Sequence, residues 1–362
     1  MMDKGLYIHI PFCEKICSYC DFCKVLYNAK YADSYLDELF KEIDSYSIDD
    51  ISSIYIGGGT PTSLNIEQLE RLLLKVTSLK GKDVSLSIEA NIENLNEEKI
   101  ILLKKYNVDR ISIGVQSFNE NLLKIMNRKH TFFEVKEKID LLHKYDINDI
   151  NIDLIYGFEE ENLQILNDDL EKILSLGITH ISLYSLMIND NTLLKIRGKK
   201  EISQDLYRKY YDFIYTKLVN NGFYRYEVSN FSKIGYESKH NLLYWRNKEY
   251  YGVGLGASGY LNGVRYTNTK SLTKYLQGER IFEKEECSES DKEFYSLMLG
   301  LRLEEGINIE EFNSLYDKDL LISYKEKIDK LIRLDLLKIE NGRLKITKDN
   351  FYIMDYILKE LL

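Results

Sequence analysis

Four of the five cysteines in the chain lie within one short stretch, from Cys13 to Cys23. Cys13, Cys17 and Cys20 follow a Cys-x3-Cys-x2-Cys spacing, directly after an apolar run typical of a strand. Three thiolates at this spacing can bind three irons of a 4Fe-4S cube and leave the fourth iron without a protein ligand. A metal centre with an open position can bind and activate a substrate. The stretch therefore predicts a reactive iron–sulfur centre.

The sequence favours two other uses of these cysteines less. A zinc site would pair Cys-x2-Cys with a second ligand pair at zinc-finger distance, whereas the remaining cysteine is the remote Cys287. A disulfide framework is untypical of cytosolic proteins, where thiols stay reduced. Cys23 comes three residues after Cys20, and we interpret it as a spare thiol, with a fourth cluster ligand as the alternative.

Composition indicates a large protein without an obvious charged partner. The 362 residues include 49 Lys and Arg against 58 Asp and Glu, a net charge of −9. This balance argues against nucleic acid and against broad contact with anionic lipid. No apolar run is long enough to cross a membrane. We expect a cytoplasmic protein with at most peripheral membrane contact.

The first half of the chain alternates between apolar, strand-like runs and stretches with helical periodicity. This alternation predicts βαβ units and a parallel sheet. The number of strands favours an α/β protein with an incomplete, (β/α)6 barrel over a closed eight-stranded one. The predicted strands lie near residues 5–11, 52–57, 83–89, 110–115, 149–154 and 180–186.

The remainder of the chain changes character twice. Residues 196–287 are rich in Tyr and Lys with weaker periodicity, which predicts an extension flanking the barrel of residues 1–195. Residues 288–362 predict three helices, then a hairpin turning at Asn341-Gly342, then a last helix. Asn-Gly favours a type I′ turn, and the order resembles a winged-helix module. Its acidic surplus favours a structural or partner-docking role over DNA binding.

The carboxyl ends of the predicted strands carry residues suited to ligand binding. In parallel α/β folds the functional residues gather at these ends. The run Gly57–Pro61, Gly-Gly-Gly-Thr-Pro, offers bare backbone that a ligand can approach closely, although a plain tight turn would explain it in isolation. The next strands end at Glu89, Gln116 and Asp153. Individually these could be solvated strand ends, but together they predict one site.

The spacing of Cys13, Cys17 and Cys20, with the aromatic Tyr19 before the third cysteine, resembles the signature of the radical S-adenosylmethionine (radical SAM) superfamily. The resemblance implies a radical SAM partial barrel that holds a 4Fe-4S cluster and SAM. Relatives in the coproporphyrinogen-oxidase branch line the SAM pocket at positions that match this sequence. The residues carried over are Tyr7, Gly57, Gly58, Thr60, Glu89, Gln116, Arg128 and Asp153.

A second motif, His240–Trp245, reads His-Asn-Leu-Leu-Tyr-Trp and is called the haem motif below. It resembles the haem-binding signature of HemW-type radical SAM haem chaperones. Imidazole is a common axial ligand of haem iron, so the resemblance implies haem binding by His240, Asn241, Tyr244 and Trp245. The alternative for a His followed by aromatic residues is a hydrogen-bonded core residue. One departure is Phe158, where such relatives usually continue with Leu-Pro-Gly after Asp153–Gly157.

The resemblance covers nearly the whole chain and implies a haem chaperone that delivers haem to acceptor haemoproteins, respiratory ones among them. Whether the protein is also an enzyme stays open, as does its assembly, for which a homodimer is one option. The alternative is an oxygen-independent coproporphyrinogen III oxidase, a class with a fourth cysteine closer to the third and without the haem motif. A radical SAM methyltransferase that opens haem is a third candidate.

Overall fold

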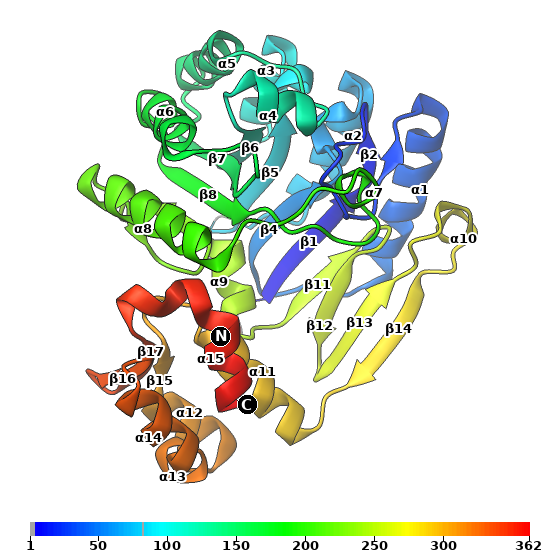
Figure 1. The fold of residues 1–362 in the computed structure, drawn as a ribbon. Coiled ribbons are helices and arrows are strands. Elements are labelled where there is room, and N and C mark those ends of the chain that lie inside the picture. Colours follow the sequence, from blue (N-terminus) through cyan, green and yellow to red (C-terminus); the bar gives the residue numbers. More distant parts are fainter. Residues whose placement is uncertain (1–3, 82) are drawn as a thin grey trace.

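A computed structural model describes residues 4–81 and 83–362. Within this part of the chain, one twelve-stranded sheet curves through the molecule, in the order β14-β13-β12-β11-β1-β4-β5-β6-β7-β8-β10-β9. The sheet stays open, because its two ends, β14 and β9, are not paired with each other. Figure 1 shows α1, α2, α3, α5 and α6 arranged along the outside of this curve. The predicted open α/β barrel is confirmed.

The six predicted strands are present, each within a few residues of its expected position, and neighbours in the chain pair in parallel. β6 is buried along its whole length, as strands covered on both faces must be. The strands are β1 (Lys4–Ile10), β4 (Ile51–Gly58), β5 (Ser85–Asn91), β6 (Arg110–Gln116), β7 (Asp149–Tyr156) and β8 (His180–Ser185).

The segment predicted as a flanking extension also adds strands to both ends of this sheet. β11 pairs in parallel with β1, and three antiparallel strands continue outward from it. At the other end β10 pairs antiparallel with β8. The added strands are β9 (Tyr224–Arg225), β10 (Asn230–Ser232), β11 (Tyr250–Val253), β12 (Ser258–Leu261), β13 (Val264–Asn268) and β14 (Ile281–Glu286).

Polar side chains cap the helices that cover the sheet. Asn65 and Gln68 form a capping box at the start of α2, and Thr131 and Glu134 form another at α5, which satisfies amide groups that the first turn leaves free. Short 3-10 helices span Pro61–Ser63 and Ile92–Asn94. The helices are α1 (Ala29–Ser45), α2 (Ile66–Thr77), α3 (Glu97–Lys105), α4 (Glu120–Ile125), α5 (Phe132–Lys144), α6 (Leu163–Leu174), α7 (Leu193–Ile196), α8 (Gln204–Asn220), α9 (Lys239–Trp245) and α10 (Leu272–Leu276).

The C-terminal module has the predicted order of helices followed by a hairpin and a last helix, but the third predicted helix is divided into two, Leu320–Ser323 and Lys325–Arg333. At the turn of the hairpin, Asn341 and Gly342 have φ values of 51° and 74°, as a type I′ turn requires. The elements are α11 (Glu289–Gly300), β15 (Ile307–Asn308), α12 (Ile309–Tyr316), α13 (Leu320–Ser323), α14 (Lys325–Arg333), β16 (Leu337–Glu340), β17 (Arg343–Ile346), a 3-10 helix (Lys348–Ile353) and α15 (Met354–Leu361).

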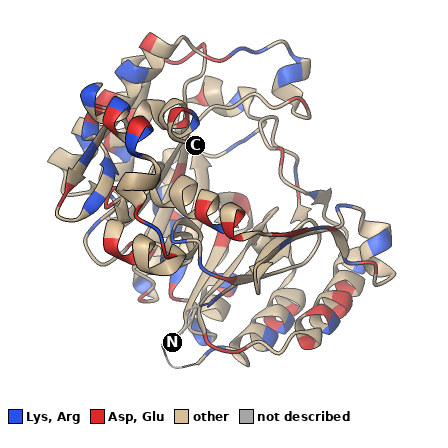
Figure 2. Cartoon of the chain, turned by 90° about the horizontal axis from the view of Figure 1, so that it is seen from below, with Lys and Arg blue, Asp and Glu red and all other residues tan. Residues whose placement is uncertain are grey.

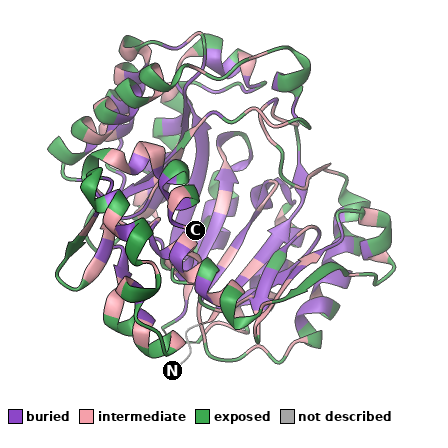
Figure 3. Ribbon diagram, turned by 60° about the horizontal axis from the view of Figure 1, so that its bottom comes forward, coloured by how far each residue is buried: buried purple, intermediate pink, exposed green. Residues whose placement is uncertain are grey.

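Two large hydrophobic clusters hold the molecule together. The first fills the space between the barrel strands and their helices, and the second lies within the C-terminal module, joined by Tyr211 from α8. Figure 3 shows the strands buried and the outer helix faces exposed. The division of the chain at residues 195 and 287 stays a prediction.

The surface carries charges of both signs, interspersed along the helices in Figure 2. Many of them form ion pairs between neighbouring helices, such as Arg71 of α2 with Asp37 of α1 at 2.6 Å. In the described residues, no helix combines the length and apolar character that crossing a membrane requires.

Candidate functional site

The carboxyl ends of the parallel strands surround a cavity of about 430 Å³, called the mouth cavity below. Three thiols and six of the eight residues predicted to bind SAM line it, so residues far apart in the sequence share one site. These residues are Cys13, Cys17, Cys20, Gly58, Thr60, Glu89, Gln116, Arg128 and Asp153.

The cysteine stretch leaves the barrel at the end of β1. Its start and end are tied together by two short parallel strands, β2 (Phe12–Cys13) and β3 (Val25–Leu26). The Thr60 hydroxyl lies 3.8 Å from the Cys13 sulfur, and an Nη1 of Arg128 lies 3.8 Å from the Cys17 sulfur. Burial raises the pKa of the Cys13 thiol to about 11, so this thiol needs a cation or a metal beside it to ionise.

The arrangement of the three thiols fits a cluster better than a single metal ion. Among the residues that the structure describes, no three His, Cys, Asp or Glu side chains gather closely enough to hold one ion. An iron–sulfur cube does not require that, because each thiolate binds a different iron. Cys23 does not line the mouth cavity. Its Sγ lies instead about 3.0 Å from where a Cβ on Gly256 would be.

The glycine run at the end of β4 gives close access to the backbone. Gly58 has a φ of 114°, which only glycine adopts readily. A Cβ on Gly57 would come within 2.8 Å of Oε1 of Glu89. Gly57 does not line the mouth cavity, so its contribution is to let β4 and the Glu89 side chain approach each other.

Glu89, near the end of β5, is held by two donors. The Tyr55 hydroxyl donates to Oε1 at 2.9 Å, and the Gly58 backbone amide donates to Oε2 at 3.0 Å. Burial, with the nearby Asp153 as a second cause, raises the pKa of Glu89 to about 7. A cationic ligand in the mouth cavity would offset both causes and favour the ionised carboxylate.

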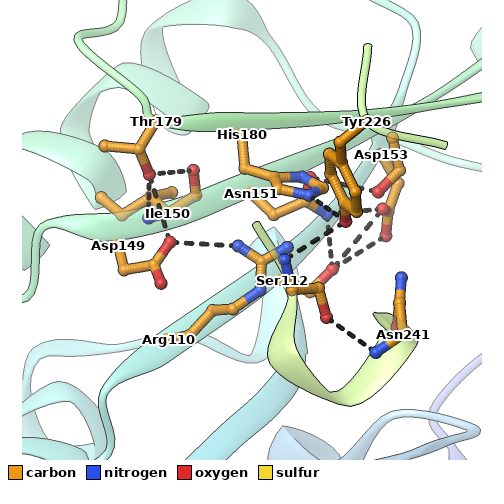
Figure 4. A network of polar contacts seen from close by, with 12 residues as sticks. Arg110, Ser112, Asp149, Ile150, Asn151, Asp153, Thr179, His180, Tyr226 and Asn241 are labelled. Atoms are coloured by element: carbon orange, nitrogen blue, oxygen red, sulfur yellow. Dashed lines mark hydrogen bonds and ion pairs between the residues drawn. The ribbon is translucent and has the colours of Figure 1, made fainter. Parts of the chain in front are cut away.

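Asp153 belongs to a hydrogen-bond network across β6, β7 and β8, shown in Figure 4. Ser112 and Asn151 donate to its carboxylate at distances of 3.3 Å and 2.7 Å. From Asn151 the network continues through His180 to the hydroxyl of Tyr226. Burial raises the pKa of Asp153, so this carboxylate is also a candidate partner for a cation.

Gln116 and Arg128 complete the predicted set in the mouth cavity. Gln116 has a φ of 73° at a register shift between β6 and β7, and such strained residues concentrate at functional sites. The Arg128 guanidinium donates to Asn91 Oδ1 at 3.0 Å and to the Gly114 carbonyl at 2.7 Å. Arg128 is therefore fixed beside the thiols rather than being a free surface charge.

The haem motif forms α9, which packs against β1 and β4. A second cavity of about 300 Å³, called the inner chamber below, is lined by Tyr7, His240, Asn241 and Tyr244 from the predicted sets. Glu89 and Asp153 line both cavities. Trp245 lines neither; the Arg302 guanidinium lies 5.6 Å from its ring centroid.

His240 is only 2% exposed, and both of its ring nitrogens are hydrogen-bonded. Nδ1 pairs with the Ser53 hydroxyl and Nε2 with the Tyr244 hydroxyl, each at 2.8 Å. Burial lowers the pKa of His240 to about 3, so the imidazole is neutral. In this conformation an iron could reach a ring nitrogen only by displacing one of these partners.

The sequence prediction omitted several cavity residues. Tyr55 and Ser112 line the inner chamber but lie within β4 and β6 rather than at the strand ends, and Tyr184 of β8 is a further lining residue. One sequence pattern could have indicated such residues: every second residue of β6 and β8 is polar or glycine. Alternate residues of a strand face the same side, so this alternation marks the side chains that point into the barrel.

Comparison with known proteins identifies both the barrel and the C-terminal module. The profile of the radical SAM superfamily matches residues 7–177, and that of the HemN C-terminal domain matches residues 291–351. Coproporphyrinogen III oxidase (HemN) from Escherichia coli has the same fold, with a TM-score of 0.87 over 99% of this chain and 90% of that chain, at 20% identity.

Proteins similar in sequence identify the family more narrowly than the superfamily profile does. The chain is 39% identical to the heme chaperone HemW of Lactococcus lactis subsp. lactis, over 100% of this chain and 98% of the relative. It is 35% identical to the heme chaperone HemW of Bacillus subtilis, with 88% of each protein covered. The value for Escherichia coli HemW is 32%, with 85% of each covered. The chain therefore belongs to the HemW family of the radical SAM superfamily.

Proposed function

We propose that this protein is a radical SAM haem chaperone, which binds a 4Fe-4S cluster, SAM and haem and delivers haem to acceptor haemoproteins. The observation that carries the proposal is the 39% identity to a heme chaperone that aligns along 98% of its length. The convergence of Cys13, Cys17 and Cys20 on the mouth cavity supports it.

In this proposal the three thiols hold the cluster, and Thr60 and Arg128 support them. The Thr60 hydroxyl favours the thiolate of Cys13 and works against the effect of its burial, and Arg128 places a positive charge beside Cys17. When bound, the cluster would supply an open iron and single-electron chemistry next to the strand ends.

SAM carries an ammonium, a carboxylate, ribose hydroxyls and a sulfonium. The mouth cavity contains complementary groups: the carboxylates of Glu89 and Asp153 for a cation and for hydroxyls, and the guanidinium of Arg128 for an anion. We assign these residues, with Gln116 and the exposed backbone at Gly58, to SAM. Thr60 lies between this set and Cys13, and Tyr7 approaches from the inner chamber.

Haem is assigned to the haem motif, as the resemblance implies. Coordination by His240 would require the imidazole to give up its bond to Tyr244 or to Ser53. Delivery to respiratory haemoproteins, a cytoplasmic location and a homodimer belong to the same proposal.

A two-part assay tests the function. The cluster-reconstituted protein is loaded with haem and mixed anaerobically with an apo-haemoprotein, and spectroscopy follows the transfer of haem. In parallel, coproporphyrinogen III, SAM and a reductant are added to haem-free protein. We expect transfer of haem and no protoporphyrinogen IX. Formation of protoporphyrinogen IX would replace the chaperone with the oxidase alternative, and the Cys17→Ala variant is the control for cluster-dependent chemistry.

A further inference from the structure

A stack of aromatic rings connects the haem motif to the mouth cavity. The His240 ring lies on the Tyr55 ring, with centroids 5.3 Å apart and planes at 25°. The Tyr7 ring lies beside Tyr55, with a centroid distance of 6.2 Å and the same angle. Tyr55 then donates its hydroxyl to Glu89. The motif therefore contacts the group that holds a predicted SAM ligand.

Hydrogen bonds and close packing fix the His240 ring. Ser53 and Tyr244 hold its two nitrogens, and a Cβ on Gly5 would come within 3.1 Å of its Cε1. An imidazole with both nitrogens bonded cannot rotate without breaking a buried hydrogen bond, which is costly. The ring is thus a rigid support under Tyr55.

We propose that His240 is a positioning residue of the SAM site, which fixes the Tyr55 ring so that its hydroxyl holds the Glu89 carboxylate. This inference rests on the proposed function, because it assumes that Glu89 binds SAM. It gives the motif a role in SAM binding in addition to haem binding. Removing either Tyr55 or His240 should therefore weaken SAM binding through Glu89.

The surroundings of Glu89 give this role an electrostatic signature. Asp153 on β7 opposes its ionisation, and Tyr55 and the Gly58 amide favour it. The other titratable groups around the inner chamber are Tyr7, Tyr184, Tyr244 and His240, which are neutral there, and Arg110, which is paired with Asp149 at 3.1 Å. Losing the Tyr55 hydroxyl removes a donor that favours the carboxylate, so Glu89 would stay protonated to higher pH.

The test uses the full chain with its cluster reconstituted anaerobically. SAM affinity is measured by calorimetry below, at and above pH 7 for the wild type, Tyr55→Phe, His240→Ala and the double variant. We expect each single variant to bind SAM about tenfold more weakly at neutral pH, the loss of one hydrogen bond to a charged group. In Tyr55→Phe, the rise of affinity with pH should move to higher pH. The titration of SAM itself is common to all variants and cancels in the comparison.

The double variant separates positioning from general packing. If His240 acts through Tyr55 on Glu89, then His240→Ala has no further effect on SAM affinity in a Tyr55→Phe background, because the bond is already absent. The matched control is Tyr210→Phe, which removes a buried tyrosine hydroxyl whose partner is the Glu161 carbonyl, at 2.8 Å, outside both cavities. The control should bind SAM as the wild type does.

Two outcomes would contradict the positioning role and the proposed function separately. Additive losses, or a Tyr55→Phe profile with unchanged pH dependence, would overturn the positioning role and leave the SAM site intact. A wild type that binds no SAM would instead overturn the proposed function. If His240→Ala does not fold, an unchanged pH profile in Tyr55→Phe, which keeps the ring, still overturns the positioning role.

Discussion

The cysteine stretch and the haem motif are the two most specific motifs of the sequence, and the fold treats them in opposite ways. The three thiols lie in a loop beyond the end of β1 and line the mouth cavity. His240 lies in α9, which packs against β1 and β4. It is 2% exposed, and both of its ring nitrogens are hydrogen-bonded. The first motif offers its ligands directly, whereas the second must exchange internal bonds for a ligand. A motif identifies residue types, but packing decides how available they are.

The largest expected effect concerns the cysteine stretch. Cys13→Ala, Cys17→Ala and Cys20→Ala should each abolish the charge-transfer absorption of the anaerobically reconstituted cluster, because each thiolate holds a different iron. Cys23→Ala is the matched control and should keep the absorption, since Cys23 does not line the mouth cavity. Loss of the absorption in Cys23→Ala would make this residue a fourth ligand and close the open iron position.

The barrel could be predicted because its strands are local signals. Each apolar run between two helical stretches became a strand within a few residues of its expected position, and Glu89, Gln116 and Asp153 line one cavity, as the strand-end rule predicts. β11 was missed because Tyr250–Val253 is short, contains a glycine and pairs with β1, which lies far away in the sequence. Such long-range pairing leaves no local pattern.

The site was only partly predictable for a related reason. The hydrogen bonds that decide the state of His240 come from Ser53 on β4 and from Tyr244 one helical turn away. The spacing of four residues in a helix could have indicated the Tyr244 contact. The Ser53 contact depends on how α9 packs against β4, which no sequence pattern specifies.

A second prediction uses the pH dependence of stability. The pKa of Glu89 is about 7 in the folded chain against an ordinary value of 4.5, so the folded state keeps this proton while the unfolded state loses it. The wild type should therefore lose stability as the pH rises from about 4.5 to about 7. Glu89→Gln lacks this titration and should lose less, which thermal unfolding at the two ends of that window would reveal.

Glu227→Gln is the matched control for this variant. Burial raises the pKa of Glu227 to about 7 as well, but Glu227 lines neither cavity. Both variants should flatten the pH dependence of stability, whereas only Glu89→Gln should weaken SAM binding. Equal SAM affinities in the two variants would remove Glu89 from the SAM site.

The third prediction tests whether His240 of the haem motif gives up a hydrogen bond to bind haem iron. Tyr244→Phe removes the hydroxyl that occupies Nε2 of His240, so haem iron could bind without breaking a bond, and haem affinity should rise about fivefold. His240→Ala should alter the Soret band in a haem titration. Tyr210→Phe is the control, because it removes a buried tyrosine hydroxyl that donates to the Glu161 carbonyl, outside both cavities. An unaltered Soret band in His240→Ala would remove His240 as a ligand.

The smallest expected effect links the two motifs. If His240 turns away from Ser53 or Tyr244 to bind haem iron, Tyr55 loses its support and Glu89 loses its donor. Saturating haem should then weaken SAM binding about threefold to fivefold, and SAM should weaken haem binding by the same factor, as linkage requires. Calorimetry of SAM with and without haem measures the first factor, and a Soret titration with and without SAM measures the second. In Tyr55→Phe the coupling should vanish, because the connection to Glu89 is already cut. Equal SAM affinities with and without haem in the wild type would show that haem binds without moving His240.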